Sequence, residues 1–345
     1  FKTKNFSQEQ SKKLHLTVKT GGKTVYTGNR MSLSLPEGDY QYTVSCGGYR
    51  SEIGTFKVEK KNTLVEFSMT RDTGWDGRTM TEPSRDAGGV YLICNAAELM
   101  WFNRHAKMDD SAKLMADITV NQDMRLDENQ LHVWNPIGNY AGYSGSRPYE
   151  GTFDGDGHSI TGLYIPGSDA KNAAFCGYLG EGGVIRNLTI DGVVKNERSR
   201  NQYVAGIAGT CKGLIAGCVN LAEISGGSYV GGIVGSADKT CRIENSVNQG
   251  SVTASAERAG GICGVLYAEG SQAVSGCCNF GKVQAKGFAG GITGDFYSGA
   301  GIVNTYNRGE VISQGISGGI AGNFRSGTMN HVYHAGTVKG AQNGT

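Results

Sequence analysis

Acidic side chains are the first residues of this 345-residue chain to consider for chemistry, because a glycoside hydrolase works with two carboxyl groups that face each other. The two groups must lie about 5 to 9.5 Å apart. The candidates are Asp154, Asp156, Asp191, Glu223, Asp238, Glu244, Asp295 and Glu310. They occupy different positions within the sequence repeat described below. The sequence therefore predicts no carboxylate pair and no catalytic residue.

Metal ligands are the second possibility, and the sequence offers two places to look. A zinc peptidase helix needs a His-Glu pair, and this sequence contains none. Asp154-Gly155-Asp156-Gly157 begins like a calcium loop, but no third Asp or Asn follows at the required spacing and no Glu closes the loop. Short acidic residues between glycines also suit a tight turn. We therefore expect a turn here, no metal site and no cofactor.

Aromatic and basic residues give a stronger indication of binding. Three late repeats carry aromatic residues at a position where earlier repeats have Cys211-Lys212 and Ala237-Asp238. Large, rigid and partly polar side chains of this kind are favoured at protein and sugar contacts. The first interpretation of these residues is a stacked aromatic ladder that stabilises a turn. The second is a binding patch, for which the candidate residues are Tyr267, Phe296, Tyr297, Phe324 and Arg325.

A repeated pentapeptide must position these residues. It occurs as AGIAG, GGIVG, GGICG, GGITG and GGIAG around Ile207, Ile233, Ile262, Ile292 and Ile320, which are 26, 29, 30 and 28 residues apart. A fixed period of 20 to 50 residues is typical of solenoids and propellers. The repeats contain short, glycine-punctuated strand patterns and no helical periodicity. The sequence therefore predicts a β-solenoid whose coils stack about 4.8 Å apart.

Equivalent residues of successive coils should form columns. Inward columns are expected for the isoleucines, for Ile224, Val252, Val283, Val311 and Val338, and for Ala208, Val234, Cys263, Thr293 and Ala321. Asn220, Asn248, Asn279 and Asn307 should form a ladder of bonded amides, in which His334 is a tolerated substitute. Most of the nine cysteines should be free thiols, because Cys218 and Cys277 share a column but are two coils apart.

The residues before the repeats predict a second module and a helix. Short alternating strands are expected at residues 14–18, 31–35, 40–46, 55–58 and 64–69, which indicates a small antiparallel β-sandwich. A helix is expected from Asn95 to about Lys107, with Asn95 and Glu98 as an N-capping pair. Its apolar face, which includes Leu99 and Phe102, should close the first coil. The coils themselves are expected to begin near residues 116–120.

The predicted fold class is therefore all-β, with a parallel β-helix preceded by a short capping helix and a small antiparallel sandwich. The predicted division places the sandwich at residues 1–71, the linker and capping helix at 72–110 and the β-helix at 111–345.

Residues 72–345 resemble the GLUG-motif surface proteins of gut-type bacteria. The resemblance rests on GWDGRTMTEP, NAAELMWFNR, WNPIGN, GTFDGDGHSITGLYI and the repeated GGIxG. Residues 1–71 resemble the PEGA-like, immunoglobulin-like modules that accompany such arrays. The resemblance implies an exported cell-envelope protein with a right-handed β-helix. Some members of this family are accessory regions of bacterial immunoglobulin A peptidases, and others are regarded as adhesins.

The expected function is that of a non-catalytic protein, extracellular or at the surface of a bacterium, whose solenoid is both spacer and recognition surface. The expected partner is a host protein or glycan, and the expected state is monomeric. A glycan-active β-helix enzyme, such as a polysaccharide lyase or hydrolase, and an accessory region of a secreted peptidase are the alternatives. A net charge of +2 argues against nucleic acid. No apolar run is long enough to cross a membrane, so membrane insertion is not expected.

Overall fold

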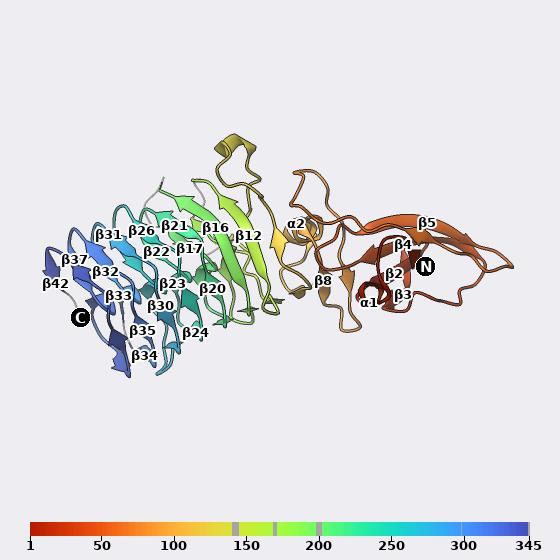
Figure 1. The fold of residues 1–345 in the computed structure, drawn as a ribbon. Coiled ribbons are helices and arrows are strands. Elements are labelled where there is room, and N and C mark those ends of the chain that lie inside the picture. The colour runs from red at the N-terminus through yellow and green to blue at the C-terminus, as the bar shows by residue number, and fades with distance from the viewer. Residues whose placement is uncertain (140–144, 168–170, 198–201, 298, 344–345) are drawn as a thin grey trace.

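The protein is an elongated, nearly all-β molecule in which a small sheet at the N-terminal end is followed by a stack of coils (Figure 1). The computed structural model describes residues 1–139, 145–167, 171–197, 202–297 and 299–343. The chain runs from the small sheet through helix α2 (Ala96–His105) and then coil by coil to the far end. The predicted β-solenoid fold is confirmed.

Four parallel sheets form the solenoid, and the chain visits them in a fixed order in each regular coil. The seven-stranded sheet contains β13 (Asn172–Ala173), β17 (Tyr203–Ala205), β22 (Tyr229–Gly231), β27 (Arg258–Gly260), β32 (Phe288–Gly290), β37 (Ile316–Gly318) and β42 (Gln342–Asn343). The six-stranded sheet contains β14 (Cys176–Leu179), β18 (Ala208–Cys211), β23 (Val234–Ala237), β28 (Cys263–Leu266), β33 (Thr293–Phe296) and β38 (Ala321–Phe324).

The two larger sheets complete the coils. The ten-stranded sheet contains β7 (Ser84–Arg85), β8 (Tyr91–Ile93), β9 (Ala112–Leu114), β11 (Thr152–Asp154), β15 (Val184–Arg186), β19 (Leu214–Ala216), β24 (Arg242–Glu244), β29 (Val274–Ser275), β34 (Gly301–Val303) and β39 (Thr328–Asn330). Its one antiparallel pair is β7 with β8. The thirteen-stranded sheet contains β10 (Ile118–Thr119), β12 (Ser159–Ile165), β16 (Thr189–Asn196), β20 (Val219–Asn220), β21 (Glu223–Gly226), β25 (Val247–Asn248), β26 (Val252–Ala254), β30 (Cys278–Asn279), β31 (Val283–Ala285), β35 (Tyr306–Asn307), β36 (Val311–Ser313), β40 (Tyr333–His334) and β41 (Val338–Lys339).

The predicted inward columns are present. The five pentapeptide isoleucines are buried, as are the small residues beside them and the branched residues from Ile224 to Val311. Val338, in the last coil, is half-buried. Strand registers place equivalent residues directly over one another, for example Val252 over Val283 and Val283 over Val311. Burial of these aligned apolar side chains is the main stabilising term of the stack.

The glycine at the second position of each pentapeptide makes room for the column of asparagines and His334. A Cβ atom at Gly261 would lie 2.3 Å from Cγ of Asn279 and 2.2 Å from the carbonyl oxygen of Gly291. The corresponding glycine Gly232 would meet Asn248 in the same way. Glycine is therefore required here by the packing of the buried amides, and not by a turn with positive φ.

The cysteines are free thiols, as expected, and all except the partly buried Cys278 are buried. Cys218 and Cys277 lie in the core, and their backbone N–H groups donate to the hydroxyl oxygens of Ser246 and Thr305 in the next coil. Burial raises the pKa of both thiols to about 12. They therefore act as small apolar side chains.

Helix α2 caps the first coils as predicted. The side chain of Asn95 accepts a hydrogen bond from the backbone N–H of Glu98 at 3.0 Å. Leu99 and Phe102 are buried, and the ring of Phe102 packs edge-on against that of Phe153 at 5.9 Å between centroids. In a full capping pair the Glu98 side chain would accept a hydrogen bond from the backbone N–H of Asn95. Here it accepts from the backbone N–H of Cys94 instead.

The solenoid begins earlier than the sequence suggested. Strand β8 precedes α2 and pairs in parallel with β9, which follows it. The segment expected to be linker and helix alone thus contributes strands β7 and β8 to the ten-stranded sheet. Strands of two or three residues are too short to show a recognisable hydrophobic period.

The N-terminal module is a small antiparallel sheet. Its four strands are β2 (His15–Thr20), β3 (Lys23–Gly28), β4 (Gly38–Ser45) and β5 (Glu52–Val58), in the order β3-β2-β4-β5. Strands β1 (Lys2–Thr3) and β6 (Glu66–Phe67) form a separate parallel pair, and the module also contains the short helix α1 (Gln8–Ser11). A further short helix, η1 (Glu128–Gln130), lies in the solenoid between β10 and β11.

One expected strand of this module is absent. Residues 31–35 form no strand, and β2 pairs instead with β3 across a turn at Gly21 and Gly22, both with positive φ. The alternating Met31, Leu33 and Leu35 are partly buried against the module's core from an irregular segment. The alternation of apolar and polar residues here reflects burial of one side of an irregular segment and does not indicate a strand.

Candidate binding site on the solenoid

The pentapeptides form a sharp corner between the seven-stranded and six-stranded sheets. A Cβ atom at Gly294 in β33 would lie 2.9 Å from the carbonyl oxygen of Ala259 in β27, one coil earlier. A Cβ atom at Gly264 would lie 2.7 Å from the backbone nitrogen of Val230. The two sheets thus approach so closely that no side chain fits between their backbones. We call this line of contact, with the side chains along it, the seam.

Three columns of side chains follow the seam. Strand register aligns Tyr203, Tyr229, Arg258, Phe288 and Ile316 on the seven-stranded sheet. It aligns Thr210, Ser236, Val265, Asp295 and Asn323 on the six-stranded sheet. Backbone hydrogen bonds between neighbouring coils align the residues that follow this sheet, which are Lys212, Asp238, Tyr267, Tyr297 and Arg325.

A fully buried carboxylate holds the seam together in the later coils. Asp295 has no exposed surface, and its Oδ2 atom accepts a hydrogen bond from Nε of Arg258 at 2.8 Å. Nδ2 of Asn323 donates to Oδ1 at 2.9 Å, and Nε of Arg325 lies 3.3 Å from the same oxygen. These partners come from the coil before and the coil after Asp295. A buried carboxylate with this many charged and polar donors fixes the positions of its partners.

Tyrosine rings and guanidinium groups stack above this carboxylate. The rings of Tyr267 and Tyr297 lie 4.7 Å apart, and the guanidinium carbon of Arg325 lies 4.2 Å from the Tyr297 centroid. Arg258 lies over the ring of Tyr229 at 5.0 Å. Such cation–π contacts hold both partners in place. The result is a half-exposed cluster of three tyrosines and two arginines.

The hydroxyl of Tyr267 remains a proton donor in this environment. Burial, with a further contribution from Tyr297, raises the pKa of Tyr267 to about 12. The cluster therefore presents the neutral phenol group of Tyr267 beside the charged guanidinium groups of Arg258 and Arg325 at neutral pH. Groups of this kind bind hydroxyl, carbonyl and carboxylate oxygens of a partner.

The structure divides the five residues expected to form a patch. Tyr267, Tyr297 and Arg325 lie together at the seam and are half-exposed or exposed. The expectation that Phe296 faces solvent is wrong, because its side chain is fully buried. Asp295 and Tyr297 flank it and point to the other side of the strand, as strand alternation requires.

Phe324 also belongs to the core column and not to the seam. It continues the inward column of Cys211, Ala237, Leu266 and Phe296. It is 42 % exposed, and β38 is the last strand of its sheet among the residues that the structure describes. Its ring contacts that of Phe296 edge-on at 5.3 Å.

Two members of the tyrosine–arginine cluster were not predicted from the sequence. Tyr229 and Arg258 stand two residues before a pentapeptide, a position also occupied by Tyr203, Phe288 and Ile316. Large side chains at this position, two residues before each pentapeptide, were the sequence feature that could have indicated a surface column. The contact of these residues with the following sheet depends on the corner geometry, which the sequence does not show.

Several of the other acidic candidates stabilise turns or form ion pairs. Asp154 accepts from the backbone N–H of Asp156 at 2.9 Å and pairs with Arg186 at 2.8 Å, while Asp156 and Gly157 have positive φ. The expected turn is therefore present. Glu310 pairs with Lys339 at 2.8 Å. Over the part of the chain that the structure describes, no group of three or more His, Cys, Asp or Glu side chains is arranged to hold a metal ion.

The fold and this surface define a β-solenoid protein with a tyrosine–arginine seam. No family model matches the sequence. Halomucin of Haloquadratum walsbyi is 28 % identical over 180 residues, which are 51 % of this chain and 2 % of halomucin. A protein of Evansella cellulosilytica, provisionally described as a Gly-rich membrane protein, is 32 % identical over 82 residues, or 24 % of this chain and 9 % of that protein. The chain thus spans a small part of both curated relatives.

A solved structure shares the fold. It comes from Bacteroides ovatus, is provisionally described as an immunoglobulin A1 protease, and aligns with a TM-score of 0.50 at 24 % identity. The alignment covers 78 % of this chain and 70 % of that structure. Among the residues described here, no helix is both long and apolar enough to cross a membrane.

Proposed function

We propose that this chain is part of a secreted or cell-surface protein in which the solenoid is a stiff spacer and the seam is a recognition surface for a host protein or glycan. The observation that carries the proposal is the tyrosine–arginine cluster around buried Asp295. Tyrosine and arginine, with tryptophan, are enriched among the residues that dominate binding energy. The provisional description of one relative as a membrane protein supports the location, as does the name of halomucin.

The cluster is organised before a partner arrives. Arg258 is tied to Asp295 and Glu257, and Arg325 is tied to Asp295 and stacked on Tyr297. Side chains that are already ordered lose little conformational entropy on binding. The seam can therefore contribute affinity without first having to become ordered.

The test uses two substitutions that separate binding from stability. Wild-type protein is applied to an array of glycans and an array of host extracellular proteins, and the strongest ligand is titrated against Tyr297→Ser. We expect the affinity to fall by at least about 2 kcal/mol, the usual threshold for a hot spot, with little change in melting temperature. Tyr333→Ser is the matched control, because Tyr333 is an exposed tyrosine on the thirteen-stranded sheet.

The competing ladder interpretation makes the opposite forecast. If the rings serve only stability, Tyr297→Ser lowers the melting temperature and the remaining folded protein binds as before. A stable variant with undiminished binding contradicts both interpretations. Failure of the wild-type protein to bind anything on either array contradicts the proposed recognition function.

An accessory role in a secreted peptidase is the second candidate. The provisional description of the solved structure with this fold supports it. In that role the solenoid would bind the peptidase's protein substrate, so its removal would raise KM and leave kcat unchanged. Steady-state kinetics of the peptidase with and without this region would measure the difference.

A further inference from the structure

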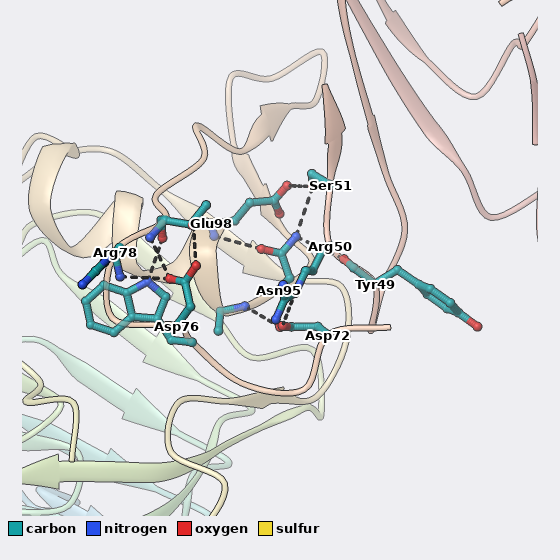
Figure 2. A network of polar contacts seen from close by, with 11 residues as sticks. Tyr49, Arg50, Ser51, Asp72, Asp76, Arg78, Asn95 and Glu98 are labelled. Carbon is teal, nitrogen blue, oxygen red and sulfur yellow. Dashed lines mark hydrogen bonds and ion pairs between the residues drawn. The ribbon is translucent and has the colours of Figure 1, made fainter. Parts of the chain in front are cut away.

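A buried carboxyl group lies where the N-terminal sheet meets the solenoid. Glu98, in the first turn of α2, has no exposed surface. Figure 2 shows its side chain next to Ser51. Its carboxylate accepts hydrogen bonds from the hydroxyls of Ser45 and Ser51 in the N-terminal module. It also accepts from the backbone N–H of Cys94, which follows strand β8 of the solenoid, at 2.7 Å. One side chain therefore connects the two parts of the molecule.

Other polar groups complete this junction. Nδ2 of Asn95 donates to the carbonyl oxygen of Tyr49 at 3.2 Å and to the hydroxyl of Ser51 at 3.1 Å. Asp72 accepts from the backbone N–H of Ala96 at 2.8 Å (Figure 2). The two parts have separate hydrophobic cores, so this network is a substantial part of what joins them.

The charge of Glu98 has no cationic partner among the described ion pairs. The junction also contains an ion pair between Arg50 and Asp72, in which Nε of Arg50 lies 4.0 Å from Oδ1 of Asp72. The other titratable groups that face Glu98 are the thiol of Cys94 and, beyond it, that of Cys46. Burial raises the pKa of both thiols, so both remain neutral at neutral pH. An ionised Glu98 would therefore be a buried negative charge that only hydrogen bonds compensate.

We propose that Glu98 is a proton-controlled latch, which holds the N-terminal sheet against the solenoid while its carboxyl group is neutral and weakens that contact when the group ionises. This inference does not depend on the proposed recognition function. It concerns the angle and stiffness between the two parts, which decide where the N-terminal sheet stands relative to the seam.

The direction of the pH dependence follows from burial. Burial raises the pKa of Glu98 from its ordinary value of 4.5 to about 7, although the hydrogen bonds from Ser51, Cys94 and Ser45 act against this rise. A group whose pKa is raised in the docked state stabilises that state fully below its ordinary pKa. The stabilisation is lost as the pH rises to the docked-state pKa. We therefore expect the docking constant to fall about tenfold per pH unit between 4.5 and 7 and to stay level above 7.

The experiment measures how well the junction amides are protected from exchange. The backbone amides of Cys94, Ala96 and Gly48 donate to Glu98, Asp72 and the Cys94 carbonyl, respectively. Their hydrogen-exchange protection factors, corrected for the intrinsic pH dependence of exchange, are measured from pH 4.5 to 8. We expect wild-type protection to fall with pH by up to about tenfold per unit, and Glu98→Gln to show a flat profile.

Asp76→Asn is the matched control. Asp76 is an acidic residue of the same region, but it is exposed and caps a local turn through Arg78 and Thr79 (Figure 2). This variant should keep the wild-type slope. A flat wild-type profile, or the same slope in Glu98→Gln, would overturn the proposal.

A second measurement covers the case in which Glu98→Gln does not fold. Carbon-13 NMR of the Glu98 carboxyl group follows its titration directly in the wild-type protein. A midpoint near 7 supports the latch, and a midpoint near 4.5 would overturn it.

Discussion

The asparagine ladder shows how single residues fix the stacking of the coils. Nδ2 of Asn220, Asn248 and Asn279 donates to Oδ1 of the next asparagine at 2.7 Å, and Asn307 bonds Nδ1 of His334 at 2.9 Å. The ladder was predicted correctly from the sequence, because one residue type recurs at one phase of the repeat. His334 takes the expected place of an asparagine and binds as one. The glycine opposite each amide could not be assigned a reason without the structure.

Asn248→Ala tests the ladder. Asn248 is fully buried, accepts from Asn220 and donates to Asn279 and to the carbonyl oxygen of Gly250. Its removal leaves buried partners unpaired, so the free energy of unfolding should fall by about 2 to 4 kcal/mol. Chemical denaturation measures the change. Gln249→Ala, at the exposed neighbouring position, should change stability by less than about 0.5 kcal/mol. Equal effects of the two substitutions would mean that the ladder contributes nothing specific.

At the scale of elements, the sequence predicted a helix correctly where an N-capping residue is followed by apolar residues at helical spacing. It did not predict strands of only two or three residues. Helix α2 was located because Asn95 is a good N-cap and Leu99 and Phe102 share one face. Strand β8 has three residues, all buried, and so offers neither alternation nor a boundary signal. The missing strand at residues 31–35 shows the reverse error, in which a good alternation belongs to irregular chain.

Replacing both Leu99 and Phe102 with Asp tests the capping role of α2. Each of these buried side chains stabilises the fold by roughly 1.5 to 3 kcal/mol, and two carboxylates facing the core would add a desolvation penalty. We expect the first coils to open, with a lower melting temperature and aggregation on heating. Arg104→Ala, on the exposed side of the same helix, is the control. A double variant that melts like the wild-type protein would show that the cap is dispensable.

At the scale of the whole molecule, the coil is the unit that the sequence encodes. The repeat predicted the solenoid, its columns and its buried surfaces, because every coil has apolar residues and glycines at the same positions. The seam was predicted only in part, because the repeat does not reveal which sheets touch. Residues as far apart in sequence as Arg258 and Asp295 meet there through the corner made by the pentapeptide.

Deletion of one whole coil tests this modularity. Ala208 and Val234 are register partners in β18 and β23, so removal of residues 208–233 joins Ile207 to Val234 without a change of register. We expect a folded protein that is shorter by about 4.8 Å, visible by small-angle scattering, with a cooperative melt. Removal of residues 208–220 alone brings strands of different sheets into register and should abolish folding. If both deletions fold, or neither does, the coil is not an independent unit.

The direction of the hydrogen bonds also determines how the molecule responds to force. Every sheet of the regular coils is parallel and stacked coil on coil, so the bonds between strands run along the long axis of the solenoid (Figure 1). A pull on its two ends would load the outermost pairing first and peel the coils away one after another. Each released coil of 26 to 30 residues would yield about 90 to 100 Å of extended chain. Under tension the solenoid would therefore lengthen in steps of one coil and dissipate mechanical energy at each step.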